Sequence, residues 1–595
     1  MLTSIGMYAQ NDTNLNQLAL LYYSQNEYDR AAELYEKLYF QTHSDIHFKY
    51  LLSCYKELDL YDKSEEIIHE QIKYKPDNFF YRASLIQLYQ ETDNNNTKEY
   101  QKLLKKTNRD ALRSESHTVD LVQAYTDLSL YDLAVDFVSD AKKEYPESIN
   151  LSKTISSLFI ETGQYEKTID EYINLLLHFP EELSFIQNQL QFVIYEQNSD
   201  ELTKILTEKV IKALNRHPKN TDLHELLIWI YLQEKDFSKA LYIAKALDSR
   251  EKRNGKDVFE IGKIAQSQKK YTAATESFSY ILSQGVENPF YQAALKAILK
   301  TAQEQLFAAD SVSYEDLRAL EQRYMSALET LGKNNQTVDV ARALAHLQAF
   351  YLGKSTEAQS LLEEMLSIPR IHPHEKALCQ IELADIQVFN NDVWTANLLY
   401  AKIALEYKNN DIGHEARFKQ AQLAYYNAQF SYAQALLDII KASTTKLISN
   451  DALELSQLIS KNTYQDSIAQ ALSLFSQADL FIYQNKYDEA IRLFDTISEK
   501  FPGHSLQSMI LFRKAEIAKT RHNYDKMQVC LESVTEQYPY DIITHKAHFL
   551  LAEYYNYTLN DKDKAREHYL KIVENFPNSF YINTARKEYR SLLEQ

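Results

Sequence analysis

The stretch 353–356, Gly-Lys-Ser-Thr, is the part of this sequence that comes nearest to a nucleotide-binding loop. Such a loop has the pattern Gly-x-x-x-x-Gly-Lys-Ser/Thr, in which an earlier glycine starts the loop and a strand leads into it. Gln348 stands where the earlier glycine is required, and residues 341–352 have the apolar spacing of a helix. The stretch therefore predicts a turn between helices and no nucleotide site.

Two groups of histidines are spaced closely enough to be considered as metal ligands. His372 and His374 fall in a predicted loop, whereas His545 and His548 share one face of a predicted helix. A zinc site needs further ligands at a recognised spacing, and neither group has one. We therefore expect no metal site and no cofactor.

Nucleophilic and acidic residues are present, but they lack the motifs that would make them catalytic. Cys54, Cys379 and Cys530 are far apart in the sequence and fall in predicted helices, where thiols usually act as small buried hydrophobic groups. Paired carboxylates such as those at 363–364 are interpreted as solvated helix faces. The sequence contains neither a Gly-x-Ser-x-Gly elbow nor a His-Glu-x-x-His helix. We therefore expect the protein not to be an enzyme.

Composition limits both the fold and the classes of partner. The chain has 595 residues but only 9 glycines and 10 prolines, too few for the turns of a sheet-rich protein, so an all-helical fold is predicted. Its length exceeds what one compact core fills. The net charge of −18 disfavours binding to the phosphate backbone of nucleic acids. No apolar run reaches the roughly 18 residues of a membrane-spanning helix.

An aromatic residue followed three positions later by a small residue recurs along the chain, with neighbouring copies about 34 residues apart. This is the period of a helix-turn-helix repeat. Small side chains allow two helices to pack closely, and large ones fill the gaps beside the crossing. The aromatic positions are Tyr28, Tyr61, Tyr131, Tyr165, Phe237, Tyr271, Phe430, Tyr487 and Tyr524, and the small positions are Ala31, Ser64, Ala134, Thr168, Ala240, Ala274, Ala433, Ala490 and Met527.

At these spacings the chain resembles the tetratricopeptide repeat (TPR) family. The resemblance implies an all-α, right-handed superhelical solenoid of antiparallel helix pairs, with roughly 12 to 15 repeats including degenerate ones. We expect an N-terminal array at 11–290, an irregular helical middle at 291–470, a C-terminal array at 471–578 and a capping helix at 579–595. The middle is predicted from the helical spacing of Leu317, Leu320, Tyr324 and Leu328, and of Leu453, Leu455, Leu458 and Ile459.

The C-terminal array resembles, in particular, cell-envelope TPR proteins of Gram-negative bacteria, including the TPR component of the outer-membrane barrel assembly machine and the periplasmic cell-division coordinator. The residues that carry this likeness are 501–505 and 576–579, each followed by an alanine-bearing helix at 514–516 and 584–586. Residues 1–10 are uncharged and mildly apolar, and we interpret them as the remnant of a truncated secretory signal.

These features predict a non-catalytic scaffold that binds proteins, located in the periplasm or associated with a cell-envelope complex. Two alternatives have the same fold. One is a cytoplasmic adaptor or assembly factor, and the other is a subunit that presents substrate to a separate enzyme. Protein partners are expected in each case, without nucleic acid and without a transmembrane segment.

In TPR proteins the first helix of each repeat lines the concave groove that binds partners. The corresponding positions of the C-terminal array combine aromatic and charged residues, as protein interfaces do. The alternative is that the two tyrosines pack against the capping helix and that the acidic residues are merely solvated. The predicted groove residues are Asp479, Ile482, Glu516, Lys519, Tyr554 and Tyr557.

Overall fold

The computed structural model describes residues 15–92, 97–197, 200–309, 311–408, 410–441, 446–463 and 469–593. All regular elements within these ranges are helices, and no strand occurs in them. The chain divides into two compact units, residues 1–261 and residues 262–595, which are described one at a time. The predicted signal remnant at 1–10 lies outside the described residues.

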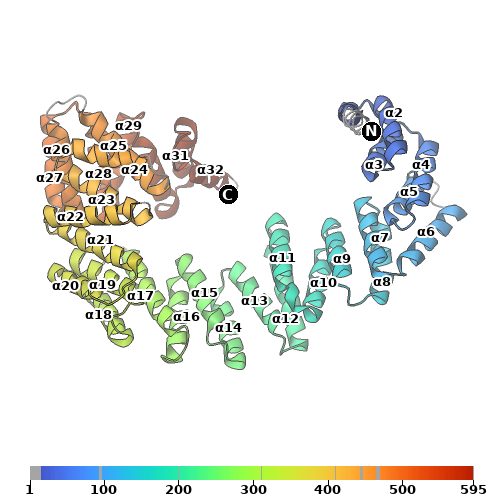
Figure 1. The fold of residues 1–595 in the computed structure, drawn as a ribbon, viewed down its shortest axis with the longest axis horizontal. Helices are drawn as coiled ribbons and strands as arrows, with labels where there is room; N and C mark the ends of the chain where they lie inside the picture. Colours follow the sequence, from blue (N-terminus) through green and yellow to red (C-terminus); the bar gives the residue numbers. More distant parts are fainter. Residues whose placement is uncertain are drawn as a thin grey trace, which may run out of the picture. The chain divides into compact units, whose positions relative to one another are not determined.

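The N-terminal unit is a series of antiparallel helix pairs, drawn in blue to green in Figure 1. A helical segment at 15–24 begins the series. The following helices are α2 (Tyr28–Thr42), α3 (Asp45–Glu57), α4 (Tyr61–Tyr74), α5 (Phe79–Glu91), α6 (Lys98–Ala111), α7 (Glu115–Asp127), α8 (Tyr131–Glu144), α9 (Ile149–Glu161), α10 (Tyr165–His178), a 3-10 turn (Pro180–Glu182), α11 (Leu183–Gln197), α12 (Asp200–Arg216), α13 (Thr221–Gln233), α14 (Phe237–Glu251) and α15 (Lys256–Ser267), in which the unit boundary falls.

The C-terminal unit continues the same alternation up to α24. Its helices are α16 (Tyr271–Ser283), α17 (Tyr291–Phe307), α18 (Tyr314–Leu331), α19 (Val338–Phe350), α20 (Ser355–Leu366), α21 (Pro373–Phe389), α22 (Val393–Glu406), α23 (Asp411–Tyr426), α24 (Phe430–Lys441), α25 (Lys446–Thr463), α26 (Gln470–Tyr483), α27 (Tyr487–Lys500), α28 (Gln507–Thr520), α29 (Tyr524–Gln537), α30 (Thr544–Glu553), a π-helical turn (Tyr554–Thr558), α31 (Lys562–Asn575) and α32 (Ile582–Ser591).

The recurring aromatic residues mark the start of second helices. Each residue of the aromatic column is the first residue of its helix, as Tyr28 is in α2 and Tyr487 is in α27. Each residue of the small column is buried, with Ala274 and Ala490 at 0% exposure. Close packing of the two helices of a pair explains both columns, because any larger side chain at the small position would separate the helices. The predicted repeat register is confirmed.

The turn inside each of these pairs follows one backbone pattern. The residue two positions before the aromatic has a left-handed conformation, with φ of 59° at Asn26, 68° at Gly163 and 59° at Asn485. The next backbone N–H then donates to a carbonyl oxygen five residues earlier, as Lys486 N donates to Phe481 O at 2.8 Å. This is a Schellman-type helix end, which satisfies carbonyl groups that the first helix leaves unpaired.

First helices of consecutive pairs pack against one another. In the N-terminal unit α5 contacts α7 and α7 contacts α9, and in the C-terminal unit α19, α21, α23 and α26 contact each other in succession. The first helices therefore form one layer of each unit, which we call the first-helix layer, and the second helices cover it. The all-α repeat architecture is confirmed.

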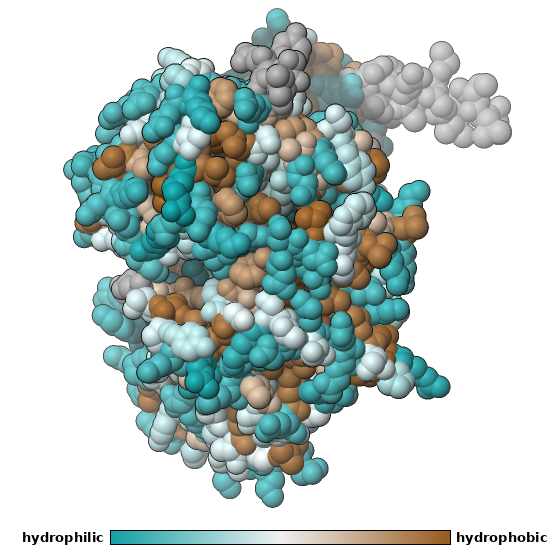
Figure 2. Space-filling model, turned by 90° about the vertical axis from the view of Figure 1, so that its left-hand side faces the viewer, coloured by the Kyte–Doolittle hydropathy of each residue, from teal (hydrophilic) through white to brown (hydrophobic). Residues whose placement is uncertain are grey.

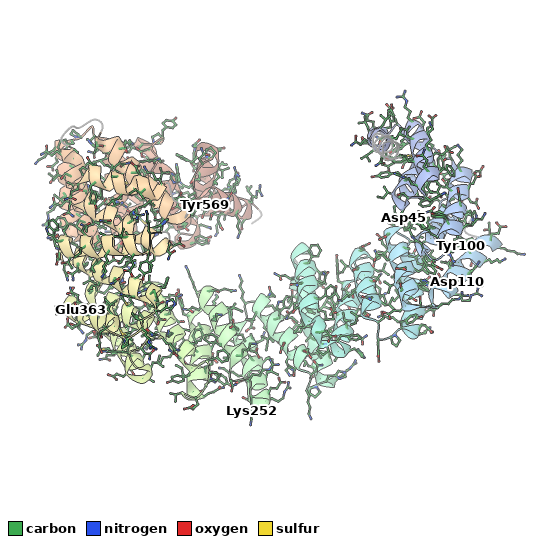
Figure 3. The ribbon with its side chains drawn as sticks, viewed as in Figure 1. Asp45, Tyr100, Asp110, Lys252, Glu363 and Tyr569 are labelled. Atoms are coloured by element: carbon green, nitrogen blue, oxygen red, sulfur yellow. The ribbon has the colours of Figure 1, made fainter. Side chains whose placement is uncertain are left out.

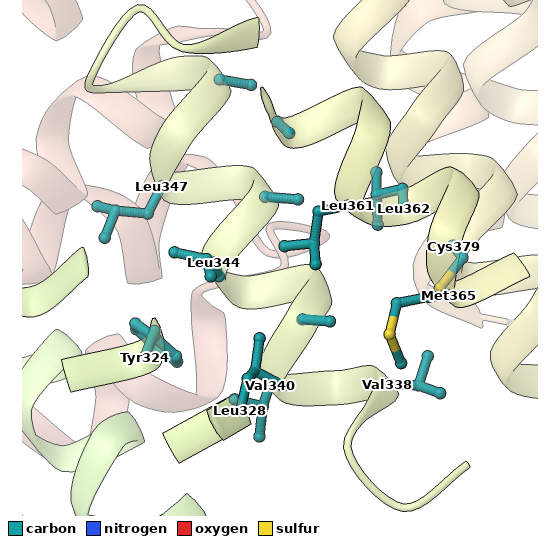
Figure 4. Packing of buried hydrophobic residues seen from close by; sticks show 14 of the residues in the cluster. Tyr324, Leu328, Val338, Val340, Leu344, Leu347, Leu361, Leu362, Met365 and Cys379 are labelled. Carbon is teal, nitrogen blue, oxygen red and sulfur yellow. The ribbon is translucent and has the colours of Figure 1, made fainter. Parts of the chain in front are cut away.

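The predicted irregular middle contains an apolar core shared by α18, α19 and α20, and one unpaired helix. Tyr324 and Leu328 of α18 pack with Leu344 of α19 and Met365 of α20 (Figure 4). The unpaired helix is α25, in which Ile459 and Ala452 are buried, whereas Leu453 is 44% exposed. Leu453 differs from the expectation because it faces the hollows beside α25 described below. The predicted array boundaries at 290 and 470 stay predictions.

Within the described ranges, every helix is either too short or too polar to cross a lipid bilayer.

Candidate protein-binding surface

A cavity of about 400 Å³ opens in the C-terminal unit between α23, α25, α26 and α28. Two of the predicted groove residues, Asp479 and Ile482, line it. Two further hollows of about 610 and 650 Å³ lie beside α25, and Glu454 of α25 lines all three. The first-helix layer is therefore hollowed where α25 lies beside it. The remaining residues around the first cavity are Phe418, Gln422, Tyr425, Tyr426, Asp451, Leu455, Leu458, Tyr483, Met509 and Arg513.

The carboxylate of Asp479 is a structural group of this cavity wall. Asp479 is 9% exposed, and its Oδ1 lies 3.0 Å from Nε of Arg513. Its Oδ2 accepts a hydrogen bond of 2.9 Å from the Tyr425 hydroxyl. Burial raises the pKa of the Asp479 carboxyl, whereas Arg513 and Tyr425 act in the opposite direction. Both oxygens are thus occupied within the chain, and the pair joins α23, α26 and α28.

A second carboxylate occupies the equivalent position earlier in the first-helix layer. Asp385 of α21 accepts from Lys419 Nζ of α23 at 2.8 Å and also from the hydroxyl of Tyr400. The Tyr483 hydroxyl donates to the backbone oxygen of Asp385 at 3.2 Å. In both pairs the cation follows the carboxylate by 34 residues, which is one repeat. Adjacent first helices are therefore joined by two half-buried ion pairs, which we call the ion-pair ladder.

The sequence analysis missed Asp385, Lys419 and Arg513, although a signal for them exists. Asp385 and Asp479 each follow an alanine in a first helix, and each has a basic residue one repeat later. Searching for opposite charges at the repeat spacing would have identified both pairs.

The other predicted groove residues differ in accessibility. Glu516 is half-buried and accepts a hydrogen bond of 2.6 Å from Nη1 of Arg513, while Lys519 is exposed and Ile482 is half-buried. Tyr554 is only 8% exposed and stacks on Tyr524, with ring centroids 5.8 Å apart. Tyr554 therefore packs within the fold, but against α29 and not against the predicted capping helix.

Tyr557 is the most accessible aromatic group among the predicted residues. It is 68% exposed, and its hydroxyl donates to Oε2 of Glu588 in α32 at 3.0 Å. This contact with the terminal helix holds the ring at the end of the first-helix layer and leaves most of it uncovered. Partner binding by the six predicted groove residues, Asp479 and Tyr554 included, stays a prediction.

Exposed apolar residues are also found on second helices of this unit. α22 exposes Trp394 at 85%, Leu398 at 69% and Leu405 at 77%. On the side of the molecule that faces the viewer in Figure 2, hydrophobic residues are scattered among hydrophilic ones. Among the described residues of α22, these exposed side chains line none of the cavities above and take no part in the ion pairs. We therefore do not assign α22 to the candidate surface.

The residues considered for chemistry are engaged in packing. Lys354 of the Gly-Lys-Ser-Thr stretch forms an ion pair of 2.7 Å with Glu321, and it precedes α20 as the predicted turn requires. The three cysteines are buried and unlinked, and burial raises the pKa of the Cys54 thiol to about 11 and that of Cys379 to about 12. Within the described ranges, no group of His, Cys, Asp and Glu side chains is arranged to hold a metal ion.

Comparison with known sequences identifies the repeats of the C-terminal unit. Residues 472–504 and 546–579 match the family profile described as tetratricopeptide repeat. These segments coincide with the helix pairs α26–α27 and α30–α31. Two helix pairs of the C-terminal unit are therefore TPR-like. No protein of curated function matches this chain.

Several solved structures are similar to this chain at low identity. The structure of Naa15/Naa10 bound to HypK-THB is 14% identical, with coverage of 98% of this chain and 97% of that one and a TM-score of 0.27. Yeast Tom70 is 12% identical over 78% and 97% of the two chains, with a TM-score of 0.30. The P58(IPK) TPR domain is 15% identical over 70% and 98%, with a TM-score of 0.18. Similarity this low carries no argument about partners or activity.

Proposed function

We propose that this protein is a non-catalytic scaffold that binds partner proteins along the first-helix layer of its C-terminal unit. The observation that carries the proposal is the cavity whose wall contains the Asp479–Arg513 pair and Ile482. TPR pairs occur on both sides of α28 in the sequence, at α26–α27 and α30–α31, so the cavity belongs to the repeat array.

The two half-buried ion pairs make this surface suitable for binding because they order its helices in the absence of a partner. An interface that is already ordered avoids the entropy cost of immobilising its side chains on association. Asp385–Lys419 and Asp479–Arg513 hold adjacent first helices in register. Apolar, charged and aromatic groups at Ile482, Lys519 and Tyr557 are then available for contact, in the mixture typical of interface centres and rims.

The proposal is tested with the double variant Glu516→Ala/Tyr557→Ala in the full chain. Tyr557 is exposed, and Glu516 is half-buried with a hydrogen bond from Arg513, so folding should be retained. Loss of an aromatic anchor together with a charged neighbour is expected to weaken a bound partner about tenfold or more. The measurement is retention of partners after crosslinked affinity purification, with quantification by mass spectrometry.

The matched control is Tyr314→Ala/Glu499→Ala, which removes an exposed tyrosine and an exposed glutamate from second helices of the same unit. This control should retain every partner. If both double variants retain all partners, or if both lose them equally, the first-helix layer is not the binding surface.

We also propose a location in the cell envelope, supported by the resemblance at 501–505 and 576–579 and by the signal-like residues 1–10. A cytoplasmic adaptor and a substrate-presenting subunit are the alternatives with the same fold. Fractionation of the native host distinguishes these hypotheses, because only the cell-envelope scaffold requires the protein in the envelope or periplasmic fraction.

A further inference from the structure

Helix α6 of the N-terminal unit carries a concentrated basic face. Its basic residues are spaced four, three, one and three positions apart, and this spacing places them along one side of a helix. All are exposed, and Thr97 and Gln101 lie beside them on the same side of the helix. The whole chain has a net charge of −18, so this face contrasts with its surroundings. The basic face consists of Lys98, Lys102, Lys105, Lys106 and Arg109.

The opposite side of α6 is anchored to the rest of the unit. Tyr100 and Ala111 are buried, and Asn108 Oδ1 accepts a hydrogen bond of 2.8 Å from the Tyr125 hydroxyl. Asp110 forms an ion pair of 3.0 Å with Arg82. Figure 3 labels Tyr100 and Asp110 beside the ribbon of this part of the unit. These contacts fix the helix, so the basic face is presented in one orientation.

The basic face has few acidic partners inside the chain, although Glu99 is exposed on the same helix three residues before Lys102. Within the described ranges, no carboxylate forms an ion pair with the four lysines. Arg109 is 3.7 Å from Asp110, but its side chain is 72% exposed and Asp110 already pairs with Arg82. Like charges three and four positions apart on a helix repel each other. An anionic ligand would relieve this repulsion.

The surroundings of α6 indicate how large that ligand can be. The preceding second helix, α4, exposes Asp62 and Glu66, and the following one, α8, exposes Asp132, Asp136 and Asp140. The basic face is thus confined to one helix, and Lys98 to Arg109 spans about 16 Å at 1.5 Å per residue. A long polyanion such as RNA would extend onto the acidic helices and be repelled there.

A lipid surface fits the basic face less well than a protein does. Helices that lie in a membrane interface insert large apolar side chains next to their basic residues. The exposed positions of α6 are polar or charged throughout, since Leu103 and Leu104 are half-buried against the unit. The remaining anionic ligand of suitable length is a short acidic segment of a protein.

We propose that the basic face of α6 binds an acidic helical segment of a partner protein, with Asp or Glu recurring every three to four residues. Such a segment would lie alongside α6 and place one carboxylate opposite each turn of lysines. Attraction of this kind speeds association and selects the partner, and salt screens it. The proposal does not depend on the surface described in the C-terminal unit.

The test uses a fluorescent peptide of about 20 residues, built from alanine and glutamate with Glu at every third or fourth position so that it is helical. Its binding to the full chain is followed by fluorescence anisotropy at low salt and at physiological salt. The variant Lys102→Gln/Lys105→Gln/Lys106→Gln should bind about tenfold more weakly, because three exposed ion pairs are lost.

The matched control is Lys73→Gln/Lys212→Gln/Lys219→Gln, which removes the same charge from scattered exposed positions of the same unit. The control should bind within about twofold of the unsubstituted chain. Equal weakening in both variants, or no peptide binding at low salt, would overturn the proposal. Tighter binding of single-stranded RNA or of anionic vesicles through the same three lysines would also overturn it and would assign the face to that ligand.

Discussion

Replacing Gly413 with alanine is expected to destabilise the C-terminal unit by about 3 kcal/mol. Gly413 lies in the first turn of α23, where an added β-carbon would be 2.0 Å from the backbone oxygen of Tyr407 and 2.6 Å from its carbonyl carbon. Because these are backbone atoms, a rotamer change cannot remove the clash. The end of α22 or the start of α23 must shift instead, and the unfolding midpoint of the full chain in urea should fall.

Gly503→Ala is the matched control for this substitution. A β-carbon on Gly503 would meet no atom within 4 Å, and its backbone is not in the left-handed region. Its unfolding midpoint should therefore equal that of the unsubstituted protein or rise slightly. An unchanged midpoint for Gly413→Ala would contradict the close approach between the end of α22 and the start of α23.

Lowering the pH from 6.5 towards 4 is expected to destabilise the helix pair α30–α31 through His548, by up to about 3 kcal/mol. His548 is 9% exposed, and its Nδ1 lies 2.9 Å from Nδ1 of His568. Burial, His568 and Lys571 lower the pKa of His548 to about 4, against 6.5 for the ordinary side chain. Between these values the unfolded chain binds a proton that the folded chain does not bind, so stability is lost as the pH falls.

The measurement is the free energy of unfolding of the full chain at pH 7 and at pH 5. His548→Gln removes the titrating group, and it should reduce the difference between the two pH values by about 2 kcal/mol. His217→Gln, at an exposed position of the N-terminal unit, should leave that difference unchanged. The same pH dependence in His548→Gln as in the unsubstituted protein would show that the buried histidine pair is not its source.

The repeat architecture was predictable because it depends on local sequence. Tyr487 marks the start of a second helix, and Ala490 marks the position where that helix lies closest to the first helix of its pair. Both features depend on residues within a single repeat. The turn between the helices required no glycine, since Asn485 and Ala428 adopt the left-handed conformation there. Spacing alone therefore identified the pairs.

The roles of individual groove residues were not predictable, because they depend on contacts between repeats. Asp479 was expected to face a partner, but its oxygens contact Arg513, one repeat later, and Tyr425, 54 residues earlier. Tyr554 was expected at the surface but stacks on Tyr524 of the preceding pair. The periodic pattern shows on which face of a helix a residue lies. It does not show which residue of the adjacent repeat that side chain contacts.

Helix α25 shows the same limit. Its apolar spacing predicted an additional helix, and the helix is present. Its place beside the first-helix layer depends on packing of its apolar side into the core and on distant polar contacts, such as Lys461 with Asp541 at 3.0 Å and Lys546 with Glu454 at 2.7 Å. No local pattern in the sequence encodes pairs separated by 80 or more residues.

The account depends on the claim that partners bind the first-helix layer of the C-terminal unit. Site-specific photocrosslinking tests this claim most directly, with a photoreactive phenylalanine analogue placed at Ile482, at Tyr557 or at Trp394. The first two positions belong to the first-helix layer and its end, whereas Trp394 is the exposed aromatic of a second helix. The account predicts partner crosslinks from positions 482 and 557 and none from 394. Crosslinks from 394 alone would contradict it.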